Sequence, residues 1–407
     1  MKTSTLGSVE TVAGGVATPR GFRAAGVSAG IKARGGLDLA LIVSETPAAS
    51  AAVFTTNLAQ AAPVVVSREH LARSGGRTRA VIVNSGCANA CTGSTGMQVA
   101  RDMASETANL LGCPAEQVLV SSTGVIGVSL DIERIRKGLP AAMSSLSADQ
   151  GPAAARAIMT TDPYPKEAAA RISIDGRDVL IGGIAKGSGM IEPMMATMLG
   201  FVTTDAAIEP ALLARALRTV VDDTFNAITV DGECSTNDCV MVLANGASGA
   251  TVTDASYDVF VEGLRAVCQP LAIGIVRGGE GATKLVTVNV TGAASVPEAR
   301  KAAKAIANSP LVKTAIHGGD PNWGRLVAVA GRAGVSFELT RAAVRIGSIL
   351  LFDHGMPHDE ASSQAAEYLQ NKDVTVTVDL GAGTQSATVW TCDLSAEYVR
   401  INAEYRT

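Results

Sequence analysis

The sequence predicts a layered α/β fold with mixed sheets. Strand-like and helix-like runs alternate along the whole chain and do not separate into a strand half and a helix half. Of the 407 residues, 47% are apolar and 18% are charged, a composition that supplies a large buried core. Because aromatic residues make up only 3%, Ala, Val, Leu, Ile and Met must fill that core. The length is sufficient for two or three lobes.

The expected strands are short runs rich in Val and Ile that are bounded by Gly, Ser, Asn or Asp. They are residues 37–43, 62–67, 80–84, 117–122, 179–185, 197–204, 238–244, 284–292, 325–330, 373–380 and 386–391. The expected helices have apolar residues at helical spacing. They are residues 97–111, 132–146, 208–223, 259–272, 296–308 and 341–351. No tandem repeat or low-complexity linker divides the chain, so the segment near residue 196 is the expected internal boundary.

The charge distribution argues against nucleic acid as a partner. The net charge is −4, no long run carries one sign, and aromatic side chains for base stacking are scarce. No stretch approaches about 18 uninterrupted apolar residues, so no membrane span is expected. The beginning, "MKTSTLGSVETVAGG", lacks the apolar region of a signal peptide. We therefore expect a soluble, cytoplasmic protein.

Cysteine and histidine usage makes a metal site unexpected. The seven cysteines include no CxxC pair, and there are only four histidines. The thiols are expected to be reduced and mostly buried, and a nucleophilic cysteine is the alternative. The usual nucleotide, hydrolase and metalloprotease motifs are absent from the sequence. Among the histidines only His317, in "AIHGGDPNWGR", lies in a glycine-rich context that is typical of a site.

Eight polar clusters are flanked by glycines or lie at expected strand ends. Loops at strand ends are where α/β enzymes place their functional groups. Any one cluster alone is more simply a turn, but eight together predict a site assembled from many segments. The clusters are residues 83–93, 121–127, 160–162, 185–199, 229–238, 277–284, 318–325 and 400–407.

Within "KGSGMIEPMMATMLGFVTTD" (186–205), Thr197 follows Ala196 in an apolar setting. A threonine hydroxyl needs a base, and an N-terminal threonine can use its own α-amine. That amine has a pKa of about 7.7–8.0, which apolar surroundings lower. Such a mechanism requires the chain to cut itself: the hydroxyl attacks the carbonyl of Ala196, and water then opens the ester. The alternative is an ordinary core strand with methionine as filler.

Taken together, these motifs resemble the ornithine acetyltransferase family of arginine biosynthesis, the bifunctional glutamate N-acetyltransferase (ArgJ) family. The similarity runs nearly from end to end, and the stretch around Thr197 is its most specific part. The motifs that carry it are "PRGFRAAGVSAGIK", "DLALIVSETPAASAAVFTTN", "VNSGCANACTG", "STG", "MTTD", "GGIAKGSGMIEPMMATML", "TVDGECSTND", "GGDPNWGR", "GRAGV" and "INAEYRT".

The resemblance implies an N-terminal-nucleophile-like fold with sheets sandwiched between helices. It implies cleavage between Ala196 and Thr197 into an α chain (1–196) and a β chain (197–407), assembled as an α2β2 heterotetramer. Thr197 would be the nucleophile, and Thr123 and Gly124 would form the oxyanion hole. No metal or cofactor is implied, and acetyl-CoA stays open as a co-substrate. The implied substrate-binding residues are Thr160, Lys186, Thr197, Glu280, Asn402 and Thr407.

The implied substrates, N2-acetyl-L-ornithine and L-glutamate, suit these residue types. Lys186 and Thr160 can donate hydrogen bonds to an α-carboxylate, and Glu280 can pair with an ammonium. The acetyl group would pass through Thr197 in a ping-pong reaction, with water excluded from the loaded site. Each residue alone also fits a plainer role: Lys186 a solvated loop lysine, Glu280 a turn residue, and the C-terminal residues a frayed end.

Two positions depart from the family pattern, and two rival functions stay open. Cys87 lies where many members have asparagine, and His317 with a second glycine is an unusual entry to "GGDPNWGR". Both departures leave the exact substrate open. One rival is a self-processing threonine amidase or aminopeptidase of related fold, which would transfer the acyl group to water. The other is a processed, non-catalytic paralogue. Dependence on an acceptor and replacement of Thr197 discriminate among them.

Overall fold

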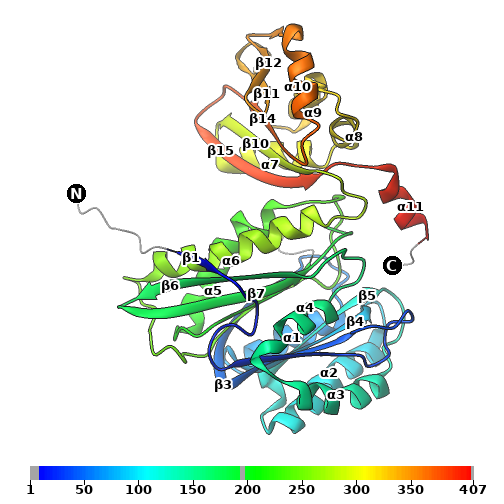
Figure 1. The fold of residues 1–407 in the computed structure, drawn as a ribbon, viewed down its shortest axis with the longest axis vertical. Coiled ribbons are helices and arrows are strands. Elements are labelled where there is room, and N and C mark those ends of the chain that lie inside the picture. Colours follow the sequence, from blue (N-terminus) through cyan, green and yellow to red (C-terminus); the bar gives the residue numbers. More distant parts are fainter. Residues whose placement is uncertain (1–8, 193–197, 405–407) are drawn as a thin grey trace.

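A computed structural model describes residues 9–192 and 198–404 of the chain. It contains a nine-stranded sheet and, above it in Figure 1, a six-stranded sheet. The larger sheet has the strand order β1-β6-β7-β8-β9-β3-β4-β5, and β2 also pairs with β3. Its strands are β1 (Glu10–Val12), β2 (Phe22–Val27), β3 (Leu39–Phe54), β4 (Arg77–Cys87), β5 (Val118–Val125), β6 (Lys166–Ile174), β7 (Arg177–Lys186), β8 (Leu199–Thr204) and β9 (Cys239–Ala244).

The long strand β3 divides the nine-stranded sheet into two facing halves. Its first part pairs with β2 and β4, and its second part pairs with β9. The pairing register with β4 shifts between Val43 and Ala48, a stretch that contains Pro47. Proline cannot donate to the ladder, so a bulge and a bend are expected there. The two halves share one core, which includes Ile42, Val83 and Leu119 from one half and Ile184, Phe201 and Met241 from the other.

Helices cover the outer face of each half-sheet (Figure 1). On the first half lie α1 (Ala62–Arg73), α2 (Gly93–Leu111) and α3 (Ile132–Ser145), and on the second lie α5 (Pro210–Asp223) and α6 (Tyr257–Arg277). The short helix α4 (Gly151–Ala157) packs into the core between the halves. The resulting order is helix, sheet, sheet, helix, which confirms the predicted layered α/β fold with mixed sheets.

The six-stranded sheet forms a second domain with its own core. Its order is β13-β12-β11-β14-β10-β15, and four helices pack against its apolar side chains. The strands are β10 (Leu285–Ala293), β11 (Ala343–Ile346), β12 (Ile349–Asp353), β13 (Met356–Pro357), β14 (Asp373–Asp379) and β15 (Gln385–Cys392). The helices are α7 (Val296–Ala307), α8 (Pro310–Gly318), α9 (Trp323–Arg332) and α10 (Ser362–Tyr368).

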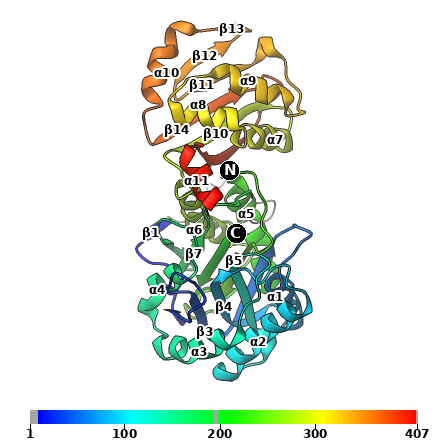
Figure 2. The ribbon, with the colours of Figure 1, turned by 90° about the vertical axis from the view of Figure 1, so that its right-hand side faces the viewer.

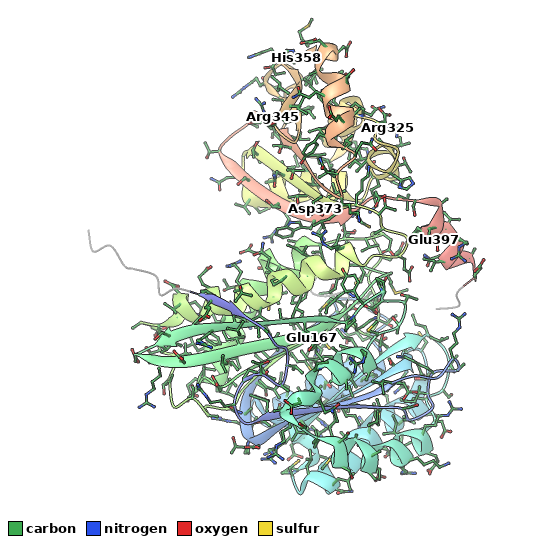
Figure 3. All side chains as sticks on the ribbon, in the orientation of Figure 1. Glu167, Arg325, Arg345, His358, Asp373 and Glu397 are labelled. Atoms are coloured by element: carbon green, nitrogen blue, oxygen red, sulfur yellow. The ribbon has the colours of Figure 1, made fainter. Side chains whose placement is uncertain are left out.

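Several contacts join the domains, among them an ion pair and the helix that follows β15. Arg277, at the end of α6, forms two parallel bonds to Asp373 at the start of β14, with N–O distances of 2.6 and 2.9 Å; Figure 3 labels Asp373 at the base of the second domain. After β15, the helix α11 (Ala396–Glu404) runs back beside the first domain (Figure 2). Through this return, the last helix of the chain reaches loops of the nine-stranded sheet.

Three of the expected elements are wrong. Residues 62–67 form the start of α1, where Pro63 occupies the first turn, and residues 325–330 lie in α9, which begins after Asn322. A short apolar run does not distinguish a buried strand from a buried helix. Residues 341–351 form the β11–β12 hairpin, because Gly347 at φ +61° turns the chain. The other expected elements are found within a few residues, except that the strand expected at 37–43 continues to Phe54 as β3; β8 is described from Leu199 onward.

Helix α6 is the most apolar of the long helices. By length and composition it is the one helix in the described parts of the chain that could cross a membrane, and 56% of its apolar window is buried. Its buried face packs against β6, β7 and α5 in the core of the first domain. This packing accounts for the apolar composition of α6, since a helix buried in a protein core is as apolar as a membrane-spanning one.

The expected boundary near residue 196 lies inside the nine-stranded sheet. It falls between β7 and β8, which are antiparallel neighbours with Lys186 opposite Leu199. The change from one sheet to the other occurs later, between α6 and β10. Both expected chains, 1–196 and 197–407, therefore contribute strands to one sheet. The division into two chains stays a prediction.

Candidate active site

A cavity of about 140 Å³ lies where loops of the nine-stranded sheet meet α11. All the predicted site residues that the structure describes line this cavity, together with Met198 and Leu199, which follow the expected cleavage point. Ala196, Thr197 and Thr407 lie outside the described residues. The predicted residues brought together are Thr123, Gly124, Thr160, Lys186, Glu280 and Asn402.

Thr123 and Lys186 form a direct pair at the wall of the cavity. The Lys186 ammonium donates to Thr123 Oγ1 at 3.0 Å, and both residues are buried. Because the ammonium supplies a hydrogen to that oxygen, the hydroxyl hydrogen of Thr123 is left to donate elsewhere. The arrangement can therefore place a hydroxyl donor and a nearby positive charge on one developing oxyanion.

Gly124 follows Thr123 at the end of β5 and could not carry a side chain. Its φ is +128°, and an added Cβ would lie 2.4 Å from the carbonyl carbon of Gly86 on the neighbouring strand β4. Only glycine tolerates this backbone conformation and close approach. The glycine lets the two strand ends converge and places a backbone N–H next to the Thr123 hydroxyl.

Asp162 anchors two of the segments that line the cavity. Its carboxylate accepts hydrogen bonds from Lys166 Nζ at 2.6 Å, Gly187 N at 2.7 Å and Thr160 N at 3.0 Å. Burial alone would raise the pKa of Asp162, but the charges of Lys166 and Lys186 and these hydrogen bonds hold it below the ordinary value. The carboxylate thus ties Thr160 to the end of β7, where Lys186 lies.

Asp238 is a buried carboxyl group at the cavity wall. Its Oδ2 has no hydrogen-bond partner among the described residues. Burial raises the pKa of Asp238 well above the ordinary value, against smaller opposing effects of Lys186 and Ser235. Burial therefore favours the neutral form of the carboxyl group, which can donate a hydrogen bond.

We expect Asp238→Asn to reduce the loss of stability that accompanies rising pH. Because the folded state raises the pKa of Asp238, it binds a proton that the unfolded chain releases above about pH 3.9, and stability falls as pH rises from there. Asparagine keeps the shape of the neutral carboxyl and removes this dependence. Thermal unfolding at pH 5 and pH 8 measures the effect. An equal drop in both proteins would contradict a protonated Asp238.

The far side of the cavity carries Glu280, which α11 holds in place. Asn402 Nδ2 donates to Glu280 Oε2 at 2.8 Å, and Glu280 N donates to the carbonyl of Ser188 at 3.0 Å. A Cβ on Gly189 would lie 2.3 Å from the same carboxylate oxygen, so a side chain there would displace the carboxylate. The carboxylate is thus presented to the cavity by segments from three distant parts of the sequence.

Several lining residues were not predicted as site residues. Asp231 and Glu233 add negative charge on the side of Glu280, and Tyr398 comes from α11. Asn237 Nδ2 donates to the carbonyls of Ala88 at 2.6 Å and Ser122 at 2.8 Å, which fixes the loop before β9. The cluster at 229–238 was the available signal, since it holds five of the additional polar lining residues and received no roles. They are Asp231, Glu233, Ser235, Asn237 and Asp238.

Comparison of the sequence with known proteins shows which family the chain belongs to. The ArgJ family model matches residues 23–407. The chain belongs to the ArgJ family. It is 50% identical over 404 residues to the arginine biosynthesis bifunctional protein ArgJ of Symbiobacterium thermophilum, covering 98% of this chain and 100% of that protein. It is 51% identical over 410 residues to the ArgJ protein of Synechococcus sp., covering 98% and 99%. The predicted family is confirmed.

A crystal structure from the ArgJ family supports the same assignment. The ArgJ protein of Bacillus halodurans is 44% identical, with a TM-score of 0.50. The match covers 51% of this chain and 100% of that chain. The whole crystallised chain of the Bacillus halodurans protein therefore corresponds to about half of this chain.

Neither departure from the ArgJ family pattern lines the cavity, although the backbone of Cys87 packs against Gly124, which does. Cys87 is buried and donates to the carbonyl of Val128 at 3.2 Å, and burial raises the pKa of its thiol. His317 Nδ1 lies 2.6 Å from Asp393 Oδ2 in the second domain. No cysteine is among the described lining residues, and no group of three or more His, Cys, Asp or Glu in the described ranges could hold a metal ion.

Proposed function

We propose that this chain is a glutamate N-acetyltransferase that moves acetyl from N2-acetyl-L-ornithine to L-glutamate. One observation carries the proposal: in an ArgJ-family chain, the cavity places the Lys186–Thr123 pair and the Glu280–Asn402 pair on its walls. An amino acid bears a carboxylate and an ammonium, and such a cavity offers each a group of opposite charge. The helix–sheet–sheet–helix layering suits the N-terminal-nucleophile-like fold that the family resemblance implies.

Activation begins with cleavage before Thr197. The Thr197 hydroxyl attacks the carbonyl carbon of Ala196, the peptide C–N bond breaks, and the nitrogen takes up a proton to become a free α-amine. Water then hydrolyses the ester, which leaves a carboxylate on Ala196 and restores the hydroxyl. Met198, the next residue, lines the cavity, and the half-length chain of the Bacillus halodurans protein is what a two-chain enzyme would yield.

Acetyl transfer follows in two steps. Thr197 Oγ attacks the acetyl carbonyl of N-acetylornithine while its α-amine accepts the hydroxyl proton. The Thr123 hydroxyl and the Gly124 N–H donate to the oxyanion, and ornithine leaves with the proton on its amine. The α-amine of glutamate then attacks the acetyl-threonine ester. N-acetylglutamate departs and the Thr197 hydroxyl regains its proton.

The remaining predicted residues bind the amino-acid parts of both substrates. Lys186 and Thr160 face the α-carboxylate, and Glu280, oriented by Asn402, faces the ornithine ammonium. Thr407, which lies outside the described residues, is proposed as a further substrate-binding residue. The assembly is an α2β2 heterotetramer in the cytoplasm. The antiparallel pairing of β7 with β8 would hold the two chains together after the cut.

Acetyl-CoA is a second acetyl donor in this proposal. A cavity of about 800 Å³ adjoins the first and shares Thr160 and Thr161 with it. Its lining includes Lys32, Arg34, Arg156 and Arg400 but only one acidic residue, Glu404. The phosphates of coenzyme A would be attracted to such a basic vestibule.

We expect Arg156→Gln to raise the KM for acetyl-CoA several-fold and to leave the KM for N-acetylornithine nearly unchanged. Of the two cavities, Arg156 lines only the larger one. Its charge should therefore act on acetyl-CoA, which bears phosphates, and not on N-acetylornithine. Steady-state kinetics with each donor measures the effect. Arg171→Gln, an exposed arginine of β6, is the control. Equal changes for both donors would contradict the vestibule.

The deciding experiment for the main function is acceptor dependence. Purified protein is incubated with N-acetylornithine, with and without glutamate, and both ornithine and free acetate are measured. Sustained ornithine release that requires glutamate and yields N-acetylglutamate supports the transferase. Release at the same rate into acetate without glutamate would instead support the amidase alternative.

A further inference from the structure

We propose that Asp231 is a positioning residue for self-cleavage: its carboxylate clamps the segment just upstream of the cut in the conformation from which Thr197 attacks. The inference rests on the proposed self-cleavage and adds a residue that acts on it through the backbone. Asp231 lies in the loop between α5 and β9, far from the cleavage point in sequence. It is part of the cavity wall, at the edge that faces residues 190–192.

Both oxygens of the Asp231 carboxylate hold backbone N–H groups of consecutive residues. Oδ2 accepts from Met190 N at 2.7 Å, and Oδ1 accepts from Ile191 N at 2.8 Å. Met190 has a φ of +57°, in the left-handed region that costs free energy for a residue other than glycine. Charge-assisted hydrogen bonds of this kind offset such a cost. The clamp therefore maintains a turn that the segment alone would avoid.

The loop around Asp231 also holds the next two residues. The carbonyl of Ile191 accepts from Val230 N at 2.7 Å and from Thr229 Oγ1 at 3.0 Å. Glu192 N donates to the carbonyl of Glu233 at 2.8 Å. On the other side of the cut, the carbonyl of Met198 accepts from Cys239 N at 3.0 Å. Both flanks of residues 193–197 are thus attached to one stretch, residues 229–239.

The second domain braces this loop. The buried Lys313 on α8 donates to the carbonyl of Val230 at 2.7 Å, and Lys304 on α7 donates to the carbonyl of Ile228 at 2.9 Å. Asn308 Oδ1 lies 2.7 Å from Thr229 Oγ1, within reach of the same hydroxyl hydrogen that faces the Ile191 carbonyl. The loop consequently reaches its described position only when the second domain has folded.

Helix α11 completes the clamp. Tyr398 donates its hydroxyl to Asp231 Oδ2 at 3.2 Å. Burial and the neighbouring Asp231 raise the pKa of Tyr398, so its hydroxyl stays protonated and remains a donor. Because this bond comes from the last helix, the clamp links the cutting of the chain to the folding of its C-terminal part.

The test is the rate of cutting after synthesis. The full chain is made in a cell-free system with a pulse of labelled amino acid, and the two fragments are followed by electrophoresis and mass spectrometry. In Asp231→Asn, one carboxylate oxygen becomes an NH₂ group that faces a backbone N–H, so the two donors oppose each other. We expect its half-time for cutting to lengthen by about tenfold or more, because small misplacements of reacting groups have large effects on rate.

A matched control separates positioning from general damage. Asp205 also accepts from two backbone N–H groups, those of Leu180 and Arg20, at the opposite end of β8, and it is more buried than Asp231. Asp205→Asn should cut at the wild-type rate. The melting temperatures of both variants in a Thr197→Ala background report folding of the uncut chain. A second variant, Asn308→Ala, weakens the brace without touching the cavity wall and should slow cutting to a smaller extent.

Three outcomes are distinguishable. Slow cutting in Asp231→Asn and Asn308→Ala, with precursors that melt like the Asp205→Asn precursor, supports the clamp. A wild-type cutting rate in Asp231→Asn overturns the clamp. The clamp is also overturned if Asp205→Asn slows cutting as much as Asp231→Asn does, because slow cutting then follows from impaired folding. If the wild-type chain itself is never cut, the proposed self-cleavage fails and the clamp has no function to serve.

Discussion

Thr197→Ala is expected to remain one uncut polypeptide and to transfer no acetyl group. Alanine lacks the hydroxyl that attacks Ala196, so the α-amine that would act as base is never released. Thr197→Ser should retain both activities at reduced rate, since it keeps the hydroxyl and loses a methyl group. Intact-mass spectrometry measures cutting and, after incubation with N-acetylornithine, shows whether the second fragment carries an acetyl group.

The control for this experiment is an exposed threonine remote from the cavity. Thr219 on α5 donates to the carbonyl of Arg215 and lies 3.4 Å from the hydroxyl of Tyr257, so Thr219→Ala should be cut and active. Full transfer activity in an uncut Thr197→Ala protein would overturn the proposed nucleophile and base together. Cutting in Thr197→Ala at the same position would show that the hydroxyl is not the attacking group.

Lys186→Met has the second-largest expected effect, a loss of kcat/KM for acetyl transfer of about 10²–10³-fold. The substitution keeps the length of the side chain and removes the ammonium that lies 3.0 Å from Thr123 Oγ1. An oxyanion donor aligned in a buried site contributes about this much to rate. The loss should be larger in kcat than in KM, because the charge interacts most strongly with the oxyanion of the transition state. Kinetics on the cut fraction alone isolates transfer from processing.

Lys284→Met controls for the removal of a partly buried lysine. The Lys284 ammonium donates to the carbonyls of Ile316 and Leu369 in the second domain, away from the cavity. It should affect stability and leave kcat for the folded enzyme close to that of the wild type. If kcat/KM of Lys186→Met equals that of the wild type, Lys186 neither stabilises the oxyanion nor binds the substrate carboxylate.

The elements that were predicted correctly have patterns that do not depend on distant residues. Strands such as β4, β9 and β10 are rich in Val and other strand-forming residues, and α2, α5 and α7 repeat apolar residues at helical spacing. Residues 62–67 and 325–330 misled because a short, mostly apolar run fits either element. Both segments are helical because a helix begins at each: Pro63 lies in the first turn of α1, and Asn322 caps the start of α9.

The sequence by itself determined the family, the layered α/β class and the residue types that the cavity needs. It did so because glycine-flanked motifs and the periodicity of apolar residues are local properties of the chain. The tertiary structure alone decided which distant segments meet: the facing half-sheets joined by β3, the return of α11 to Glu280, and the attachment of residues 190–192 to Asp231. It also decided that Asp238 is buried and that its pKa is raised, since desolvation and hydrogen bonding depend on neighbours from the whole fold.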